Sequence, residues 1–202
     1  AGGGLGRAYA LSFAAEGANV VVNDIRGEAA QGVEAEIKAK GGQALANSGD
    51  ITTLEGAQGI ADAALAAFGE VHVLVNNAGV LRDRMFLSLS EEDWDTVMRV
   101  HLKGHFCLAS VLGRRWRDAS KAGKPVDARI INTTSGAGLQ GSIGQSNYAA
   151  AKAGIAARTL NQAAELARYN ITANAVAPSA RTGMTSAVPE MAARMAKPED
   201  GG

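Results

Sequence analysis

The sequence predicts an α/β fold in a single domain, with a doubly wound parallel sheet and helices on both of its faces. Three observations support this prediction. Short apolar, β-branched runs alternate with helical stretches along the chain, and no hairpin signal joins two of the runs. The chain contains no internal repeat. Its 202 residues with 47% apolar content can bury one substantial core.

The first half of the chain is expected to alternate between helix and strand three times. Glycines directly follow two of the helical stretches, at Gly17 and Gly41, as is typical of helix ends. Residues 52–55 have the form of a capping box. The expected elements are helix 8–16, strand 20–23, helix 27–40 with Val33 and Ile37 inward, strand 43–47, helix 52–68 and strand 71–75.

The second half continues the alternation. Residues 90–93 form another capping-box-like start, with acidic residues where the helix dipole favours them. The expected elements are helix 90–117, loop 121–125, strand 128–134, a glycine-rich connection at 136–144, a helix ending near 169, and strand 171–176, which Pro178 ends. Core or subunit contacts are expected from Trp94, Val97, Val100, Phe106 and Leu108.

Charge and cysteine content exclude several classes of function. Twenty basic and twenty acidic residues cancel, so nucleic acid and acidic membrane surfaces are not expected as partners. The one cysteine, Cys107, lies in an apolar helical setting and cannot form an intrachain disulfide, which favours a reducing compartment. No signal peptide and no apolar run of spanning length occur, so a soluble, cytoplasmic protein is expected.

Both ends of the chain are unusual for this fold. The sequence begins inside a glycine run with no strand before it, and it stops in a polar stretch. A parallel sheet needs the strand that leads into such a loop. We therefore expect a domain truncated at both ends, without its first strand and its C-terminal strand. Residues 1–202 alone are expected not to fold into an active enzyme.

Ser135, Tyr148 and Lys152 have the spacing of a catalytic site. Tyr148 and Lys152 are four apart in an alanine-rich helical run, so their side chains emerge one turn apart on one face. A fixed ammonium nearby lowers the pKa of a phenol, which would make Tyr148 a usable acid/base. Ser135 ends a strand, where its hydroxyl can bond a substrate oxygen. Taken alone, the Tyr–Lys pair also fits a coincidence on a helix surface.

The glycine run Ala1-Gly-Gly-Gly-Leu-Gly-Arg predicts a phosphate-binding loop. Its glycines let the backbone approach a pyrophosphate, which the free N–H groups and the dipole of the next helix stabilise. A lone glycine pattern is weak and also fits a flexible linker. Asp24 favours the phosphate loop, because it follows strand 20–23, eighteen residues after Gly6. An acid there bonds ribose hydroxyls and repels a 2′-phosphate, so the expected cofactor is NAD rather than NADP.

Polar residues after two further strands are candidate cofactor contacts. Asp50 and Ile51 follow strand 43–47 as a candidate adenine contact, although an aspartate at a turn is more often a cap. Residues 76–79, Asn-Asn-Ala-Gly, follow strand 71–75 and suit a loop that ties the sheet edge to a cofactor. The sequence thus predicts a Rossmann-type dinucleotide site at the carboxyl edge of the sheet.

These motifs, in this order, resemble the short-chain dehydrogenase/reductase family. The match covers nearly the whole chain and includes the glycine loop, Asp24, Asp50, residues 76–79, Ser135, Tyr148 and Lys152. Residues 81–86, 92–95, 99–104 and 177–185 are most similar to one branch, the dehydrogenase domain of peroxisomal multifunctional enzyme type 2 (17β-hydroxysteroid dehydrogenase type 4) and its free-standing bacterial relatives. The resemblance implies NAD-linked oxidation of a (3R)-hydroxyacyl-CoA or a steroid alcohol in lipid metabolism.

The resemblance also implies the site residues. The expected catalytic residues are Ser135, Tyr148, Lys152 and His101, and no metal site is expected. His101 stands where the family usually has an asparagine that holds a water between the lysine and solvent; an imidazole could keep that role or make only a structural bond. The expected cofactor contacts are Gly2, Gly4, Leu5, Gly6, Asp24, Asp50, Ile51, Asn77, Ala78, Gly79, Tyr148, Lys152, Pro178 and Thr182.

A homo-oligomer is expected from the two long helices, 90–117 and 145–169. Both carry apolar residues on more than the one face that a sheet can cover. The resemblance implies the same homodimer or homotetramer. An apolar lid with Met184, Met191 and Met195 is expected after Pro178, over a small-molecule substrate.

Two alternatives stay open. A 3-oxoacyl carrier-protein reductase would run the reaction the other way with NADPH, and Asp24 argues against it. A non-catalytic dinucleotide-binding protein would share the fold without turnover. The complete set of Ser135, Tyr148 and Lys152 argues against that second alternative, because a mere binder need not hold all three.

Overall fold

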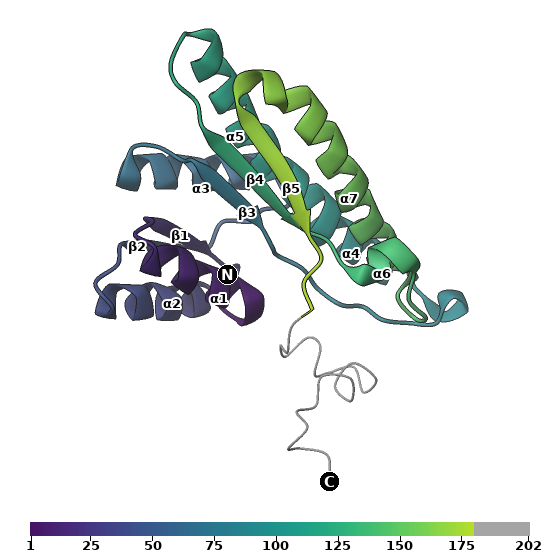
Figure 1. Ribbon diagram of the computed structural model, residues 1–202. Coiled ribbons are helices and arrows are strands. Elements are labelled where there is room, and N and C mark those ends of the chain that lie inside the picture. Colours follow the sequence, from purple (N-terminus) through teal and green to yellow (C-terminus); the bar gives the residue numbers. More distant parts are fainter. Residues whose placement is uncertain (180–202) are drawn as a thin grey trace.

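Parallel strands form two sheets in the computed structural model, which describes residues 1–179 (Figure 1). β1 (Val20–Asn23) pairs with β2 (Ala44–Asn47), and a second sheet has the order β3 (Val73–Asn76), β4 (Ala128–Thr133), β5 (Ile171–Val176). Every pairing is parallel, which confirms the predicted α/β class. No strand within residues 1–179 pairs β1 with β3, so the sheet is divided in two.

Helices connect the strands and cover both faces. They are α1 (Gly4–Ala15), α2 (Gly27–Ala39), α3 (Leu54–Phe68), α4 (Glu91–Val97), α5 (Gly104–Lys121), α6 (Gly136–Gln140) and α7 (Ser146–Leu166). Short 3-10 turns, η1 (Phe86–Ser88) and η3 (Ala167–Tyr169), precede α4 and follow α7. Figure 1 shows α1 and α2 beside β1 and β2, and α5 and α7 beside the three-stranded sheet.

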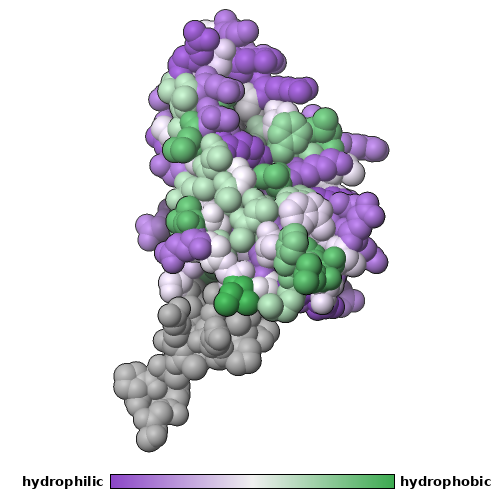
Figure 2. Space-filling model, turned by 90° about the vertical axis from the view of Figure 1, so that its right-hand side faces the viewer, coloured by the Kyte–Doolittle hydropathy of each residue, from purple (hydrophilic) through white to green (hydrophobic). Residues whose placement is uncertain are grey.

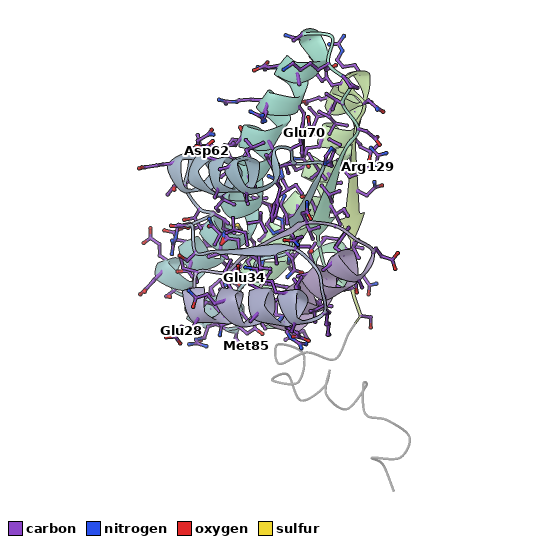
Figure 3. All side chains as sticks on the ribbon, turned by 90° about the vertical axis from the view of Figure 1, so that its left-hand side faces the viewer. Glu28, Glu34, Asp62, Glu70, Met85 and Arg129 are labelled. Atoms are coloured by element: carbon purple, nitrogen blue, oxygen red, sulfur yellow. The ribbon has the colours of Figure 1, made fainter. Side chains whose placement is uncertain are left out.

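A small apolar core fixes β1 and β2 against α1 and α2. Its buried members are Ala10, Val22, Ala30, Val33, Ile37 and Ala44. Val33 and Ile37 are 3% and 1% exposed, on the inner face that the helical period predicts. The face of α2 that points away from this core is polar and carries Glu28 and Glu34 (Figure 3). Asp62 on the neighbouring helix α3 also lies at the surface.

A larger core lies between β3–β5 and the helices α3, α5 and α7. It contains Ile130, Ile171 and the thiol of Cys107, all fully buried. Trp116 closes one end, because its Nε1 donates a hydrogen bond to the Val71 carbonyl at 2.7 Å. The Val71 carbonyl is therefore bound by an indole rather than by a neighbouring strand. The strand β3 begins at Val73, two residues later than predicted.

Side-chain caps set the start of two helices. Ser90 begins α4 and accepts a hydrogen bond from the Asp93 amide at 3.1 Å, which is one of the two bonds of the predicted capping box. Thr53 caps α3 by accepting from the Gly56 amide at 3.0 Å. The predicted box at 52–55 is therefore wrong by one residue, because the side chain of Thr53 rather than Thr52 makes the capping bond.

The predicted long helix from residue 90 is present and runs on to Lys121, in three parts. A π-helical segment, η2 (Met98–Lys103), joins α4 to α5 without a break. Trp94 and Phe106 are 38% and 47% exposed, whereas Val97 is fully buried. Within residues 1–179 no helix is long and apolar enough to cross a membrane.

Candidate active site

Asp24 lies at the carboxyl end of β1 and holds the glycine run. Its Oδ2 accepts a hydrogen bond from the Gly2 amide at 2.9 Å, and its Oδ1 accepts one from the Arg26 amide at 3.0 Å. Burial alone would raise the pKa of this carboxyl, but the amide hydrogen bonds outweigh burial and bring the pKa to about 2. Asp24 is therefore a fixed anion at neutral pH, where the sequence predicts a ribose contact.

The glycine run meets the loop that follows β3. A Cβ on Gly6 would lie 3.1 Å from Nδ2 of Asn77, so the two segments touch. Asn77 Oδ1 accepts from the Thr133 hydroxyl at 3.4 Å, at the end of β4. The first helical bond of α1 runs from the Arg7 amide to the Gly3 carbonyl at 3.1 Å, so the amides before Arg7 have no helical partner. Free amides at a helix N-terminus suit a pyrophosphate.

Asp50 stabilises the turn after β2 through a side-chain hydrogen bond, which is the ordinary role of an aspartate in a turn. Its Oδ1 accepts from the Thr52 amide at 2.8 Å, and this bond lowers the pKa of the carboxyl. Ile51 turns toward α5, because a Cβ on Gly104 would lie 2.8 Å from its Cδ1. A shallow groove at the carboxyl end of β2 is lined by Asn47, Ser48, Gly49, Thr53, Glu55, Gly56, Gly59 and Ile60. The adenine contact stays a prediction.

The remaining predicted cofactor contacts fall at three places. Leu5 lies in the first turn of α1, and Ala78 and Gly79 follow β3. Pro178 is half-buried just after β5. Thr182 and the lid methionines Met184, Met191 and Met195 lie outside the described residues.

Ser135, Tyr148 and Lys152 converge at the carboxyl end of β4. Ser135 follows that strand and caps α6 by accepting from the Ala137 amide at 3.3 Å. Tyr148 and Lys152 lie in the first two turns of α7, and Lys152 Nζ is 5.6 Å from the centroid of the Tyr148 ring. Burial raises the pKa of the Tyr148 phenol above its ordinary value, and the Ser135 hydroxyl opposes that rise.

Lys152 is held from two sides and is 2% exposed. Its Nζ donates to the Thr133 carbonyl at 2.6 Å, and its own carbonyl accepts from the Thr134 hydroxyl at 2.7 Å. Burial lowers the pKa of the ammonium to about 8. The expectation that Lys152 brings the pKa of Tyr148 below its ordinary value is wrong here, because burial raises that pKa.

His101 lies in η2, fully buried against Tyr148. The two ring centroids are 5.2 Å apart and the planes meet at 90°. His101 Nε2 is 2.9 Å from the Val80 amide nitrogen and 2.8 Å from the Val80 carbonyl oxygen, while Nδ1 has no hydrogen-bond partner within residues 1–179. Burial, followed by the charge of Lys152, lowers the pKa of the imidazole to about 4, so His101 is neutral at pH 7.

A chain of buried amides supports the strand ends, and sequence reasoning missed it. Asn76 Nδ2 donates to Asn132 Oδ1 at 3.0 Å, and Asn132 Nδ2 donates to Thr159 Oγ1 and Gln162 Oε1, each at 2.9 Å. These bonds join β3, β4 and α7. Asparagines in apolar strands were the available signal, because a buried amide needs partners.

His105 is a second residue that sequence reasoning missed. It is fully buried in α5, and its Nε2 lies 3.3 Å from the Ala78 carbonyl. It follows His101 by four positions, the spacing that places two side chains on one helix face. That spacing was the only signal in the sequence.

The chain is similar to known proteins over most of its length. A family model described as short chain dehydrogenase matches residues 1–193. The chain is 47% identical to hydroxyacyl-CoA dehydrogenase ChsB1 of Mycobacterium tuberculosis over 195 residues, which are 93% of this chain and 61% of that protein. It is 44% identical to peroxisomal multifunctional enzyme type 2 of Mus musculus, with 98% of this chain and 27% of that protein covered.

A solved structure has the same fold. The crystal structure of a short chain dehydrogenase from Mycobacterium avium matches with a TM-score of 0.88 and 57% identity, over 91% of this chain and 66% of that one. The resemblance to the peroxisomal branch and its bacterial relatives is confirmed. The chain spans less than two thirds of the length of each of these three relatives.

Proposed function

Since the chain belongs to the short-chain dehydrogenase family, we propose that it is an oxidoreductase that interconverts a secondary alcohol and a ketone with NAD. One observation carries the proposal. Ser135, Tyr148 and Lys152 meet at the end of β4, on the sheet edge where Thr133 reaches the Asn77 loop. An acid/base and a hydrogen-bond donor thus lie beside a dinucleotide-type edge.

Tyr148 moves the proton in this mechanism. In oxidation the phenolate takes the hydroxyl proton of the alcohol, and in reduction the phenol returns a proton to the ketone oxygen. Ser135 donates a hydrogen bond to that oxygen and stabilises its developing charge. The buried Lys152 ammonium lies 5.6 Å from the ring centroid, where its charge would offset part of the rise that burial causes in the pKa of the phenol. NAD supplies the hydride acceptor when it is bound.

The residues at the sheet edge fit NAD. The free amides at the start of α1 suit the pyrophosphate, and the fixed anion Asp24 suits ribose hydroxyls rather than a 2′-phosphate. Lys152 and Tyr148 would hold the nicotinamide ribose. Asn77, Ala78, Gly79 and Pro178 follow neighbouring strands and would line the rest of the cofactor.

A (3R)-hydroxyacyl-CoA or a hydroxysteroid is the proposed substrate. Two relatives are named a hydroxyacyl-CoA dehydrogenase and a peroxisomal multifunctional enzyme. Apolar side chains are exposed beside the site: Met85, Phe86, Leu87 and Ile143, at 63%, 72%, 95% and 89%. Their segments are joined, because the Arg84 amide donates to the Gly144 carbonyl at 2.8 Å. An apolar rim of this kind suits an acyl chain or a sterol ring.

We also propose a homodimer or homotetramer in a reducing, cytoplasmic compartment. Ala150, Ala153, Ala157 and Leu160 are exposed along one face of α7, and Figure 2 shows apolar residues running over that side of the molecule. Small residues allow another helix to approach closely, as a second copy of α7 would. The single cysteine, buried in α5, supports the reducing compartment.

The test is a substrate panel followed by the absorbance of NADH. The panel contains (3R)- and (3S)-hydroxyacyl-CoAs of several lengths and steroid alcohols, each with NAD and with NADP. We expect turnover of the (3R) series or of a steroid alcohol with NAD. Faster reduction of a 3-oxoacyl carrier protein with NADPH would favour the reductase alternative. NADH binding without turnover of any substrate would favour the non-catalytic binding protein.

A further inference from the structure

Two buried histidines face the same short loop. His101 in η2 and His105 in α5 lie four residues apart on one continuous helix, and both are 0% exposed. The loop is residues 78–80, which follow β3 and include two of the proposed cofactor contacts. Each imidazole makes a hydrogen bond to the backbone of this loop.

His101 contacts the loop through Nε2. That nitrogen lies 2.9 Å from the Val80 amide nitrogen and 2.8 Å from the Val80 carbonyl oxygen, so either neutral tautomer makes one hydrogen bond to the same residue. A Cβ on Gly79 would lie only 2.4 Å from Cε1 of His101. The imidazole therefore occupies the space that any side chain at position 79 would need.

His105 fixes the other end of the loop. Its Nε2 lies 3.3 Å from the Ala78 carbonyl, which makes Nε2 the donor. The backbone carbonyl of His105 accepts from Asn76 Nδ2, also at 3.3 Å. Residues 76, 78 and 80 thus all make hydrogen bonds to the two helical turns that contain His101 and His105.

His101 also contacts Tyr148, the proposed acid/base. The edge-to-face contact with Tyr148, 5.2 Å between centroids, places the imidazole between that ring and the loop. The π-helical segment η2 carries His101, and such a widened turn is common at functional sites. The ring therefore fills the distance between the proton-transferring side chain and residues 78–80.

We infer that His101 and His105 are positioning residues that clamp loop 78–80, and that His101 sets its distance from Tyr148. The inference rests on the proposed function where it treats this loop as a cofactor contact. It assigns the role of His101 to Nε2, which binds Val80. A water-holding role like that of the family's usual asparagine would instead use Nδ1, which has no partner among the described residues.

Two substitutions at position 101 separate these roles. The amide of His101→Gln reaches about as far as Nε2 and can keep the Val80 bond, whereas the amide of His101→Asn reaches only about as far as Nδ1 and cannot. Hydrogen exchange of the Val80 amide is measured first, without cofactor. We expect protection close to wild type in His101→Gln and about tenfold faster exchange in His101→Asn, as the loss of one hydrogen bond allows.

NADH affinity and turnover are measured next in the same variants. We expect His101→Asn to weaken NADH binding about tenfold and to lower kcat, and His101→Gln, as the conservative variant, to recover most of the NADH affinity that His101→Asn loses. The opposite pattern, with Asn active and Gln inactive, would assign the role to Nδ1 and overturn the clamp. Unchanged Val80 exchange together with unchanged NADH binding in His101→Asn would overturn it as well.

Variants at positions 105 and 79 test the clamp independently, in case a substitution at position 101 disturbs folding. His105→Gln keeps a donor toward Ala78, whereas His105→Phe fills the space without one, and only His105→Phe is expected to weaken NADH binding. Gly79→Ala keeps both histidines but displaces the His101 ring, so it should speed Val80 exchange like His101→Asn. If wild type oxidises no alcohol, the proposed function fails, but Val80 exchange still decides the clamp.

Discussion

Tyr148 is half-buried at the start of α7, and its hydroxyl is the only part that Phe lacks. We expect Tyr148→Phe to lower the rate of alcohol oxidation at least about a hundredfold, because the acid/base is lost. NADH binding should stay nearly unchanged. Steady-state rates and an NADH fluorescence titration measure the two effects.

Tyr169→Phe is the matched control for that change. Tyr169 is also half-buried, but it lies in η3 at the far end of α7. It should keep the wild-type rate. If Tyr148→Phe retains more than about a hundredth of the rate, Tyr148 is not the acid/base.

Asp24 should make the protein prefer NAD. The Asp24 carboxylate would repel the 2′-phosphate of NADP and leave acceptor oxygens without donors. We expect this to weaken NADP binding by about 1–3 kcal/mol, or roughly tenfold to more than a hundredfold in affinity. Values of kcat/KM with NAD and NADP measure the preference, which Asp24→Ser should largely abolish. Asp62→Ser, on the exposed side of α3, should leave it unchanged. Equal efficiency of wild type with both cofactors would contradict this assignment.

At the residue scale, the sequence predicted what depends on spacing along one helix. Tyr148 and Lys152 emerge together because four residues make about one turn. The direction of the Tyr148 pKa was predicted wrongly, because burial comes from segments far apart in the chain. His105 was missed for the same reason: only the packed structure brings Ala78 to its ring.

Gly138 allows α6 to lie directly on α7, and its replacement tests that contact. A Cβ there would lie 2.6 Å from the Ala153 nitrogen and 2.7 Å from the Lys152 carbonyl carbon. We expect Gly138→Ala to destabilise the fold by about 1–3 kcal/mol, because backbone atoms cannot move aside cheaply. The rate should also fall, since Ser135 and Lys152 are pushed apart.

Gly136→Ala is the control within the same short helix. A Cβ on Gly136 meets nothing within 4 Å, so this variant should melt at or slightly above the wild-type temperature. Thermal melts of the two variants give the comparison. Equal melting temperatures would mean that α6 does not pack on α7 as described.

At the element scale, the sequence predicted the helices that carry an apolar period or a capping box. It did not predict α6, which has two glycines in five residues and little helical propensity. α6 forms because Ser135 caps it and α7 supports it. The π-helical form of η2 also had no sequence signal, since the run of residues 98–103 suits an ordinary helix equally well.

The molecule should lose stability in mild acid. The pKa of buried His101 is about 4, whereas that of an unfolded histidine is about 6.5, so the unfolded chain binds more protons between these values. The free energy of unfolding is therefore highest above about pH 6.5 and falls as the pH approaches 4. The difference of about 2.5 pH units corresponds to about 3 kcal/mol. His105, whose pKa burial also lowers, adds to the loss.

Urea unfolding between pH 7.5 and 4.5 measures this dependence. His101→Gln has no titrating ring and should show a flatter profile. A wild-type stability that does not change between pH 7 and 5 would contradict the prediction.

The oligomer should depend on the exposed face of α7. Ala157→Arg places a charge where a second helix would approach closely, so we expect it to shift the assembly to monomers. Ala35→Arg, on the exposed side of α2, should keep the wild-type mass. Light scattering compares the two, and a monomeric wild type would refute the proposed assembly.

At the scale of the whole molecule, alternation of strand and helix predicted the fold class and the sheet edge at which the candidate site residues lie. It did not predict that β1–β2 and β3–β5 would form separate apolar cores. Hydrophobic period tells which face of an element is buried, but not which other element covers it. The contact between Gly6 and Asn77, for example, joins segments that no local pattern relates.

The indole of Trp116, bonded to Val71 and only 5% exposed, gives the molecule a built-in optical reporter. The other tryptophan, Trp94, is 38% exposed at the opposite end of the same long helix. A buried indole emits at shorter wavelength than a hydrated one, so red-shifted fluorescence follows the opening of the core around Trp116. The emission of Trp94, already in contact with water, changes little. A single emission spectrum therefore distinguishes loosening of the sheet core from events near α4.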